Sequence, residues 1–160
     1  MSVTAISGWG REYLGKAPGK VADVDPAQHF AIQQTLVRYA YTLDQHDLAA
    51  LEQLFTSSAT WTFSSAGQAA LGPISGREAI LDFVRGTLTE QAAQQRHNLA
   101  NISVSAATAG TADAQAYLML TSSAGGAPSI TATGFAMFKL EKSDSRWRIA
   151  ELFLGFDNGL

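Results

Sequence analysis

The order of the predicted helices and strands constrains the fold of this chain more than any other feature. Amphipathic helical segments fill the first part of the chain around a single strand, and four β-type segments follow one another to the end. Consecutive strands joined by short turns pair antiparallel, because a parallel pair needs a crossover of a dozen or more residues. We therefore predict an α+β fold with an antiparallel meander, and not a doubly wound parallel sheet.

Three segments have helical periodicity and recognisable start signals. The first begins at residues 25–26, where an aspartate N-cap precedes a proline, and is predicted to end near Leu43. Asp47 can cap a short second helix. Ser75 and Glu78 have the spacing of a capping box and are predicted to open a third helix.

Five segments have the composition and alternation of strands. They are Ala59–Ser64, His97–Ser105, Thr111–Ser122, Ser129–Lys142 and Arg146–Phe156. The last of them is apolar on both faces, which is typical of a strand in the middle of a sheet. Within the second, the alternation places Leu99, Asn101 and Ser103 on the same face as His97.

Composition and charge exclude several kinds of partner. The chain has 160 residues, a net charge of -3 and a pI near 5.5, so it has no positive field to attract nucleic acid or an anionic membrane. It has no cysteine, which excludes disulfides, thiolate metal ligands and cysteine nucleophiles. No apolar run approaches the roughly 18 residues of a membrane helix. We expect a cytoplasmic protein that binds neither nucleic acid nor membrane.

Residues 1–24 follow neither the helical nor the strand period and are interpreted as an N-terminal extension, with Trp9 and Tyr13 as anchors on the domain. Residues 25–160 are predicted to form a single domain. Hydrophobic residues make up 46% of the chain and charged residues 16%, which leaves apolar surface beyond one small core. We therefore expect a homodimer.

Asp44 and His97 are the candidate catalytic residues. Asp44 falls on the apolar arc of the first helix, and a carboxylate on the buried side of a helix needs a partner or a function. A histidine in a pocket can accept a proton near neutral pH when a carboxylate fixes its tautomer. His97 is the histidine that falls inside a predicted strand. The alternative is that His97 lies at a solvated strand edge and Asp44 caps the turn after the first helix.

Six large side chains are candidates for lining a pocket, although such side chains also build ordinary cores. They are Tyr41, Trp61, Phe63, Tyr117, Met119 and Phe135. The ligand that such a lining favours is a small hydrophobic or aromatic molecule.

Motifs for other chemistry are absent from the sequence. It has no dinucleotide-binding fingerprint, no Walker sequence and no serine-hydrolase elbow. The three histidines lack the spacing of metal ligands. We expect neither a cofactor nor a metal ion.

A set of short motifs resembles one known family. In chain order they are RYAYTLDQHDL (38–48), LF (54–55), ATW (59–61), GREAI (76–80), RHNLAN (96–101) and RWRI (146–149). No single motif is specific, but the ordered set is similar to the SnoaL-like branch of the nuclear transport factor 2-like superfamily over about residues 28–157. The resemblance implies a cone-shaped α+β barrel, in which three N-terminal helices close a strongly curved, mostly antiparallel sheet around the active site.

The resemblance also implies roles for individual residues. Scytalone dehydratase and hexachlorocyclohexane dehydrochlorinase, two members of the superfamily, use a His–Asp pair whose positions match His97 and Asp44. Tyr39 matches the hydrogen-bonding tyrosine of steroid isomerases in the superfamily, but its place at the edge of the apolar arc of the first helix favours a core tyrosine. The two acidic residues of those isomerases have no counterpart in this chain. The position of the first acid is close to Phe63, and residues 134–136 stand where the second acid is expected. The resemblance therefore disfavours a two-acid isomerase and leaves the substrate open.

We predict a cofactor-independent enzyme in which His97, held by Asp44, removes a proton from a ring-bearing metabolite. Elimination as in a dehydratase, cyclisation and isomerisation all fit this chemistry. The alternative is a non-catalytic small-molecule-binding or accessory domain with the same fold. A third hypothesis is a structural dimer module, because members of the superfamily often dimerise through the outer face of the sheet.

Overall fold

The computed structural model describes residues 7–14 and 24–158, of which positions 105 and 106 are described by their backbone alone. The helices are α1 (Arg11–Leu14), α2 (Pro26–Asp44), α3 (Leu48–Leu54) and α4 (Arg77–Glu90). The strands are β1 (Phe55–Ser65), β2 (Leu71–Ser75), β3 (Gln94–Ala107), β4 (Thr111–Ser123), β5 (Ser129–Ser143) and β6 (Arg146–Phe156).

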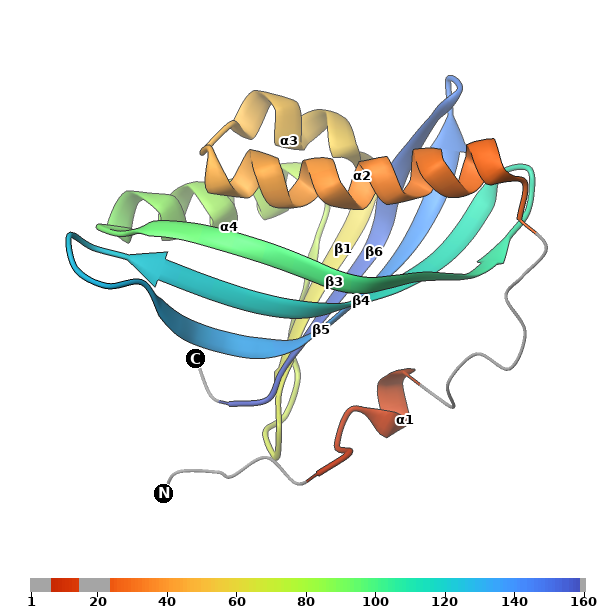
Figure 1. Cartoon of the computed structure of the whole chain (residues 1–160). Helices are drawn as coiled ribbons and strands as arrows, with labels where there is room; N and C mark the ends of the chain where they lie inside the picture. Colours follow the sequence, from red (N-terminus) through yellow and green to blue (C-terminus); the bar gives the residue numbers. More distant parts are fainter. Residues whose placement is uncertain (1–6, 15–23, 159–160) are drawn as a thin grey trace.

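The six strands form one open, strongly curved sheet in the order β2-β1-β6-β5-β4-β3 (Figure 1). Neighbouring strands are antiparallel except for β1 and β6, which are parallel. The predicted α+β fold and the meander from β3 to β6 are confirmed, and β6 lies in the interior of the sheet as its two apolar faces predict. Because the sheet does not close on itself, β2 and β3 are its edges.

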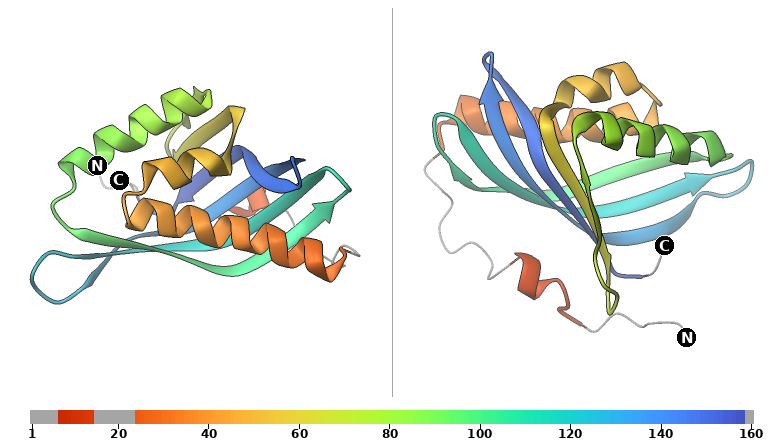
Figure 2. Two further views of the ribbon diagram at one scale, coloured as in Figure 1. Left: turned by 90° about the horizontal axis from the view of Figure 1, so that it is seen from above. Right: turned by 180° about the vertical axis from the view of Figure 1, so that it is seen from behind.

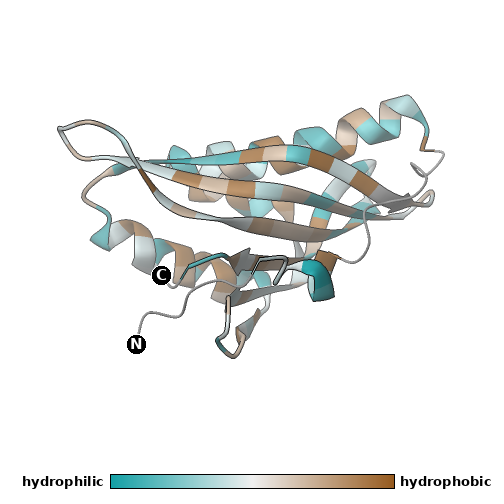
Figure 3. Cartoon of the chain, turned by 60° about the horizontal axis from the view of Figure 1, so that its bottom comes forward, coloured by the Kyte–Doolittle hydropathy of each residue, from teal (hydrophilic) through white to brown (hydrophobic). Residues whose placement is uncertain are grey.

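Helices α2, α3 and α4 cover one face of the sheet, and α1 lies against the opposite face, which we call the outer face (Figures 1 and 2). Figure 3 brings the outer face forward and shows hydrophilic and hydrophobic residues alternating along its strands. The core fills the space between the sheet and the three helices that cover it. Its fully buried side chains include Leu36, Tyr39, Phe55, Phe138 and Ile149. In the described part of the chain, no helix is long and apolar enough to span a membrane.

The first two predicted helix starts are confirmed. Asp25 caps α2 by accepting a hydrogen bond from the backbone N–H of Gln28 at 3.1 Å. Asp47 caps α3 in the same way, with the backbone N–H of Ala50 at 2.9 Å. Each aspartate satisfies an amide group that helix geometry leaves without an internal partner.

The predicted start of α4 at Ser75 is wrong. Ser75 belongs to β2, where it pairs with Thr60 of β1, and Gly76 is the N-cap residue without a side-chain hydrogen bond to the helix. Gly76 has a φ of 92°, a conformation that favours glycine. The pairing of β2 with β1 keeps Ser75 in the sheet, so its hydroxyl does not form a capping box with Glu78.

The predicted face of Asn101 and Ser103 is also wrong. Asn101 has a φ of 52°, and the register of β3 against β4 shifts between Ala100 and Ser103. An irregularity of this kind changes which face the following side chains occupy. Asn101 and Ser103 consequently line a pocket beside α1, whereas Ile102 and Val104 pack in the core.

Helix α1 and the turn before it are held on the outer face by aromatic contacts. The ring of Trp9 lies 5.2 Å from that of Phe135, and Tyr13 stacks on Phe153 at 4.8 Å. Trp9 Nε1 also donates a hydrogen bond to Asp157 at 2.7 Å. The two predicted anchors of the N-terminal extension therefore contact the domain, and the rest of that extension lies largely outside the described residues.

Gly134 and Gly86 give a matched pair of predictions about stability. A Cβ at Gly134 would overlap the carbonyl oxygen of Gly155 on β6, so Gly134→Ala must push two paired strands apart. We expect this variant to lower the free energy of unfolding by about 3 kcal/mol. Gly86 is exposed in α4 with open space around it, and Gly86→Ala should raise the free energy of unfolding by about 0.5–1 kcal/mol. Urea unfolding followed by circular dichroism measures both effects, and equal stabilities of the two variants would contradict the geometry.

Candidate functional site

The Asp44 carboxylate binds both the side chain and the backbone of His97. Its Oδ1 lies 2.7 Å from Nδ1 of the imidazole and 3.0 Å from the backbone nitrogen, and its Oδ2 lies 3.2 Å from that same nitrogen. Both side chains are largely buried, with exposed fractions of 9% for Asp44 and 17% for His97. The structure thus brings together two candidate residues that are 53 positions apart in the sequence.

The end of α2 positions the Asp44 carboxylate. The helix ends at Asp44 itself, and the Asp44 carbonyl accepts a hydrogen bond from the Gln94 side chain at 2.9 Å. This bond satisfies one of the carbonyl groups that a helix leaves free at its end. In the turn that follows, Asp47 is the residue that caps α3. The side chain of Asp44 therefore does not cap α3, and its carboxylate binds His97 of β3.

The hydrogen bond from His97 to Asp44 sets the chemistry of the imidazole. An ionised carboxylate only accepts hydrogen bonds, so Nδ1 carries the proton and the neutral ring has its lone pair on Nε2. Among the described residues, Nε2 has no hydrogen-bond partner. It is the atom that can accept a proton from a bound molecule, as in a general base oriented by a carboxylate.

An aromatic cluster lies between the sheet and its covering helices. Tyr39 of α2 contacts Trp61 of β1 with ring centroids 6.0 Å apart, and Trp61 stacks on Phe63 at 5.1 Å. Phe83 of α4 lies 5.3 Å from Phe63. The negative charge of Asp44 contributes to the raised pKa of Tyr39, so the aromatic cluster interacts electrostatically with the His–Asp pair.

Two polar atoms in this cluster have no hydrogen-bond partner. Tyr39 Oη and Trp61 Nε1 are both buried and unpaired among the described residues. Burial, together with the negative charge of Asp44, raises the pKa of Tyr39 well above its ordinary value. Tyr39 therefore keeps its proton and, like Trp61, can donate a hydrogen bond. Buried donors without a partner are uncommon in proteins and indicate a place for a ligand or a water molecule.

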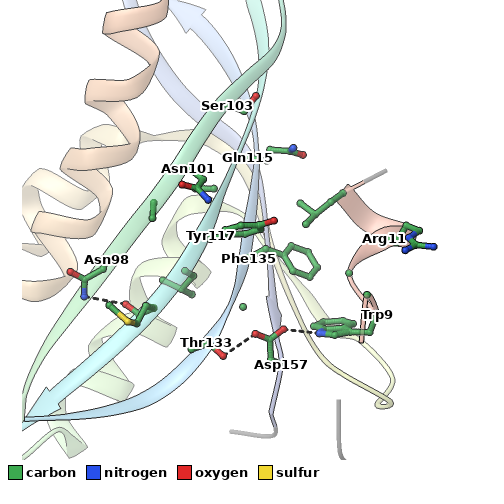
Figure 4. A pocket seen from close by; sticks show the side chains of 18 residues that line it. Trp9, Arg11, Asn98, Asn101, Ser103, Gln115, Tyr117, Thr133, Phe135 and Asp157 are labelled. Atoms are coloured by element: carbon green, nitrogen blue, oxygen red, sulfur yellow. Dashed lines mark hydrogen bonds between the residues drawn. The ribbon is translucent and has the colours of Figure 1, made fainter. Parts of the chain in front are cut away.

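The six predicted pocket residues do not share one site. Trp61 and Phe63 belong to the aromatic cluster on the helix-covered face. Tyr41 lies apart from both groups on the surface of α2, with 65% of its area exposed. The other three line the pocket beside α1 on the outer face, and neither Asp44 nor His97 is part of that lining: Tyr117, Met119 and Phe135. Figure 4 shows Tyr117 and Phe135 in this pocket.

Two contacts of the site had no signal in the sequence that marks them as functional. Gln94 bonds the backbone carbonyl of Asp44, which is 50 positions away in the sequence, and no local pattern predicts a bond between a side chain and a distant carbonyl. Phe83 occupies the buried stripe of α4, where helical spacing indicates packing but does not identify Phe63 as the neighbour.

The described part of the chain contains no cluster of candidate metal ligands. Among its residues, no three side chains of His, Cys, Asp or Glu gather as a metal site requires. Asp44 and His97 by themselves would supply two ligands, whereas protein metal sites use three or four. Proton transfer is the chemistry that this pair supports.

Comparison with known proteins agrees with the predicted fold. The chain matches the family described as SnoaL-like domain over residues 27–152. A search of curated proteins found no match. The family match confirms the SnoaL-like resemblance. Solved structures with the same fold include proteins with a cystatin-like fold and a protein described as nuclear transport factor 2-like.

Three of the similar solved structures illustrate the range of proteins with this fold. Aln2 from a Streptomyces species is 25% identical, with a TM-score of 0.71 over 84% of this chain and 94% of Aln2. A Catenulispora acidiphila protein in complex with S-DNPA is 19% identical, with a TM-score of 0.71 over 83% of this chain and 96% of that protein. The β subunit of the benzoate 1,2-dioxygenase from Burkholderia mallei is 19% identical, with a TM-score of 0.70 over 83% of this chain and 91% of the subunit.

The raised pKa of Tyr39 predicts how stability responds to alkaline pH. Above pH 10.0, the ordinary value for tyrosine, the unfolded chain releases this proton while the folded chain retains it. The unfolded state then binds fewer protons, so the free energy of unfolding falls as the pH rises, by about 1.4 kcal/mol per pH unit from this residue. Urea unfolding at a series of pH values on both sides of this point measures the slope.

Two variants separate Tyr39 from other causes of alkaline destabilisation. Tyr39→Phe keeps the ring packing and should reduce the slope by the equivalent of one proton. Tyr41→Phe removes an exposed phenol from the same helix and should keep the wild-type slope. Identical slopes in the wild type and in Tyr39→Phe would mean that Tyr39 ionises as readily in the folded chain as in the unfolded one.

Proposed function

Because the chain belongs to the SnoaL-like domain family, we propose that it is a cofactor-independent enzyme with its active site between the helices and the sheet. His97 is the general base, and Asp44 orients it. The substrate is a ring-bearing small molecule from which the base removes a proton, followed by the loss of water or another β-leaving group. Cyclisation and isomerisation begin with the same proton transfer.

The 2.7 Å contact between Asp44 Oδ1 and His97 Nδ1 is the observation that carries this proposal. The same carboxylate also accepts the backbone N–H of His97, so the ring and the strand that carries it are fixed relative to the end of α2. Both side chains are largely buried, where an electrostatic interaction is stronger than in water. Such an arrangement holds a base in one tautomer and one orientation before a substrate arrives.

In the elimination, His97 Nε2 accepts a proton from the carbon next to a substrate carbonyl group. The electrons of the broken C–H bond form a C=C bond as the C–O bond to the β-hydroxyl breaks. The departing hydroxyl takes the proton from Nε2 and leaves as water, which returns the imidazole to its neutral form. Asp44 stays ionised throughout and stabilises the imidazolium.

Tyr39 and Trp61 are the proposed donors to the substrate. Negative charge develops on the carbonyl oxygen when the neighbouring carbon loses its proton, and donors already in place stabilise that charge. Tyr39 Oη and Trp61 Nε1 are buried and have no partner among the residues that the structure describes, as such donors must be before the substrate binds. The rings of Trp61, Phe63 and Phe83 supply apolar surface for packing against a substrate ring.

A non-catalytic ligand-binding or accessory domain is the second candidate function. The similarity to a dioxygenase β subunit supports it, because that fold is there part of a larger enzyme. The similarity to a protein in complex with S-DNPA supports a small-molecule ligand under either candidate. Turnover that depends on His97 distinguishes the two candidates.

Dehydration of 3-hydroxy-1-tetralone tests the catalytic proposal. This compound is a ring-bearing β-hydroxy ketone, and loss of water converts it to fluorescent 1-naphthol. The wild type should accelerate the reaction. His97→Ala should lower kcat/KM by about 10³-fold because the base is lost, and Asp44→Asn should lower it by about 10²–10⁴-fold because the imidazole takes the wrong tautomer.

His46→Asn is the matched control for these variants. It removes an exposed imidazole at a position with a φ of 57°, which asparagine tolerates, and it should leave the rate unchanged. A wild-type rate in His97→Ala would end the proposed mechanism. Binding of 1-naphthol by a wild type that does not accelerate the dehydration would favour the non-catalytic candidate.

A further inference from the structure

The pocket on the outer face is separate from the His–Asp pair. It lies between β3, β4 and β5 on one side and the α1 segment on the other, and its volume is about 780 Å³. In Figure 4, side chains of the strands lie on one side of it, with α1 and Trp9 on the other. Asn98, the residue after His97, lines this pocket, so the backbone of β3 separates the two sites. A pocket of this volume accommodates a drug-sized molecule.

Four polar side chains on the strands lining this pocket are free to bind a ligand. Asn101 and Ser103 come from β3, and Gln115 and Tyr117 come from β4, with Gln115 paired to Ser103 in the register of the two strands. No side-chain hydrogen bond joins any of the four to another described residue. Amides and hydroxyls both donate and accept hydrogen bonds, so together they can bind several oxygen atoms of one molecule.

Aromatic and apolar side chains adjoin these polar groups. Tyr117 is directly opposite Phe135 in the pairing of β4 with β5, and Trp9 contacts Phe135 from the α1 side. Tyr117 is 55% exposed and Met119 is 38% exposed. Large side chains that gather at one exposed hollow indicate a binding surface.

Two charged residues, Arg11 and Asp157, line this pocket. Asp157 accepts hydrogen bonds from Trp9 Nε1 at 2.7 Å and from Thr133 Oγ1 at 2.8 Å. The guanidinium of Arg11 points away from Tyr117 and Phe135 in Figure 4. The four unpaired polar side chains on β3 and β4 are neutral, and they match the hydroxyl and carbonyl groups of an uncharged molecule.

We propose that this pocket binds an uncharged, planar ring compound that carries hydroxyl or carbonyl groups. The ring packs against the exposed side chains of Tyr117 and Met119, and the oxygen atoms bind the amides of Asn101 and Gln115 and the hydroxyl of Tyr117. A second copy of the chain is the other candidate occupant of this face. Because Trp9 and Tyr13 of the α1 segment contact Phe135 of β5, the sheet of a second copy cannot enter the hollow between α1 and β3, whereas a small molecule can. The proposal does not depend on the catalytic function of His97.

The three tryptophans of the chain report on different places. Trp9 lies at the outer pocket, Trp61 lies in the aromatic cluster under the helices, and Trp147 is buried in β6 beside Lys142. We expect 2,7-dihydroxynaphthalene, titrated into the ¹⁵N-labelled full chain, to shift the indole N–H signal of Trp9 in a saturable manner. The signal of Trp147 should not move.

Two double variants show whether the polar side chains bind the probe. Gln115→Leu combined with Tyr117→Phe should weaken the Trp9 titration by about tenfold or more, because two hydrogen bonds are lost. Gln53→Leu combined with Tyr41→Phe changes the same residue types at exposed positions on the helices and should leave the titration as in the wild type. Circular dichroism verifies that both proteins are folded.

Three results would overturn the proposal. The first is a shift of the Trp61 signal without any shift of Trp9, which would place the probe under the helices. The second is an unchanged affinity in the Gln115→Leu, Tyr117→Phe variant. The third is a Trp9 signal that moves with protein concentration in the absence of probe, together with a dimer in sedimentation, which would make this face an interface between copies.

Discussion

The hydrogen bonds between the Asp44 carboxylate and His97 are the interaction on which the helix-covered site depends. They join the end of α2 to β3, an edge strand with a neighbouring strand on one side only. Gln94 adds a second link between the same two elements through the Asp44 carbonyl. One carboxylate therefore fixes the proposed base and also attaches the free edge of the sheet to the helix layer. An edge strand otherwise presents unpaired backbone groups, and here the N–H of His97 has a partner.

Several features of the fold followed from local patterns because local physics decides them. Asp25 and Asp47 cap their helices because an aspartate side chain reaches an amide two or three residues further on. The interior place of β6 followed from its two apolar faces. The pairing of Asp44 with His97 followed from an anomaly, since a carboxylate on the apolar side of a helix has to find a partner.

The features that the sequence did not predict depend on distant contacts or on one backbone angle. Pairing with Thr60 holds Ser75 in a strand, although its spacing to Glu78 is that of a cap. The left-handed conformation of Asn101 changes the face of the residues that follow it. The candidate pocket residues separated into two groups because apolar and aromatic side chains occur on both faces of the sheet. Alternation shows that Tyr117 and Leu118 face opposite ways, but it does not show which of them lies under the helices.

The alternation along β4 has a consequence for how this chain can diverge. The side chains of Leu118 and Ala116 are buried, while those of Tyr117 and Met119 are exposed at the outer pocket. Odd and even positions of this strand therefore meet different structural requirements. Substitutions in the odd set can alter what the outer face recognises without disturbing the packing beneath the helices, and changes in the even set can adjust that packing while the outer face stays the same. Adjacent residues of β4 can thus change independently of each other. Each one is constrained instead by residues of other strands on the same face of the sheet.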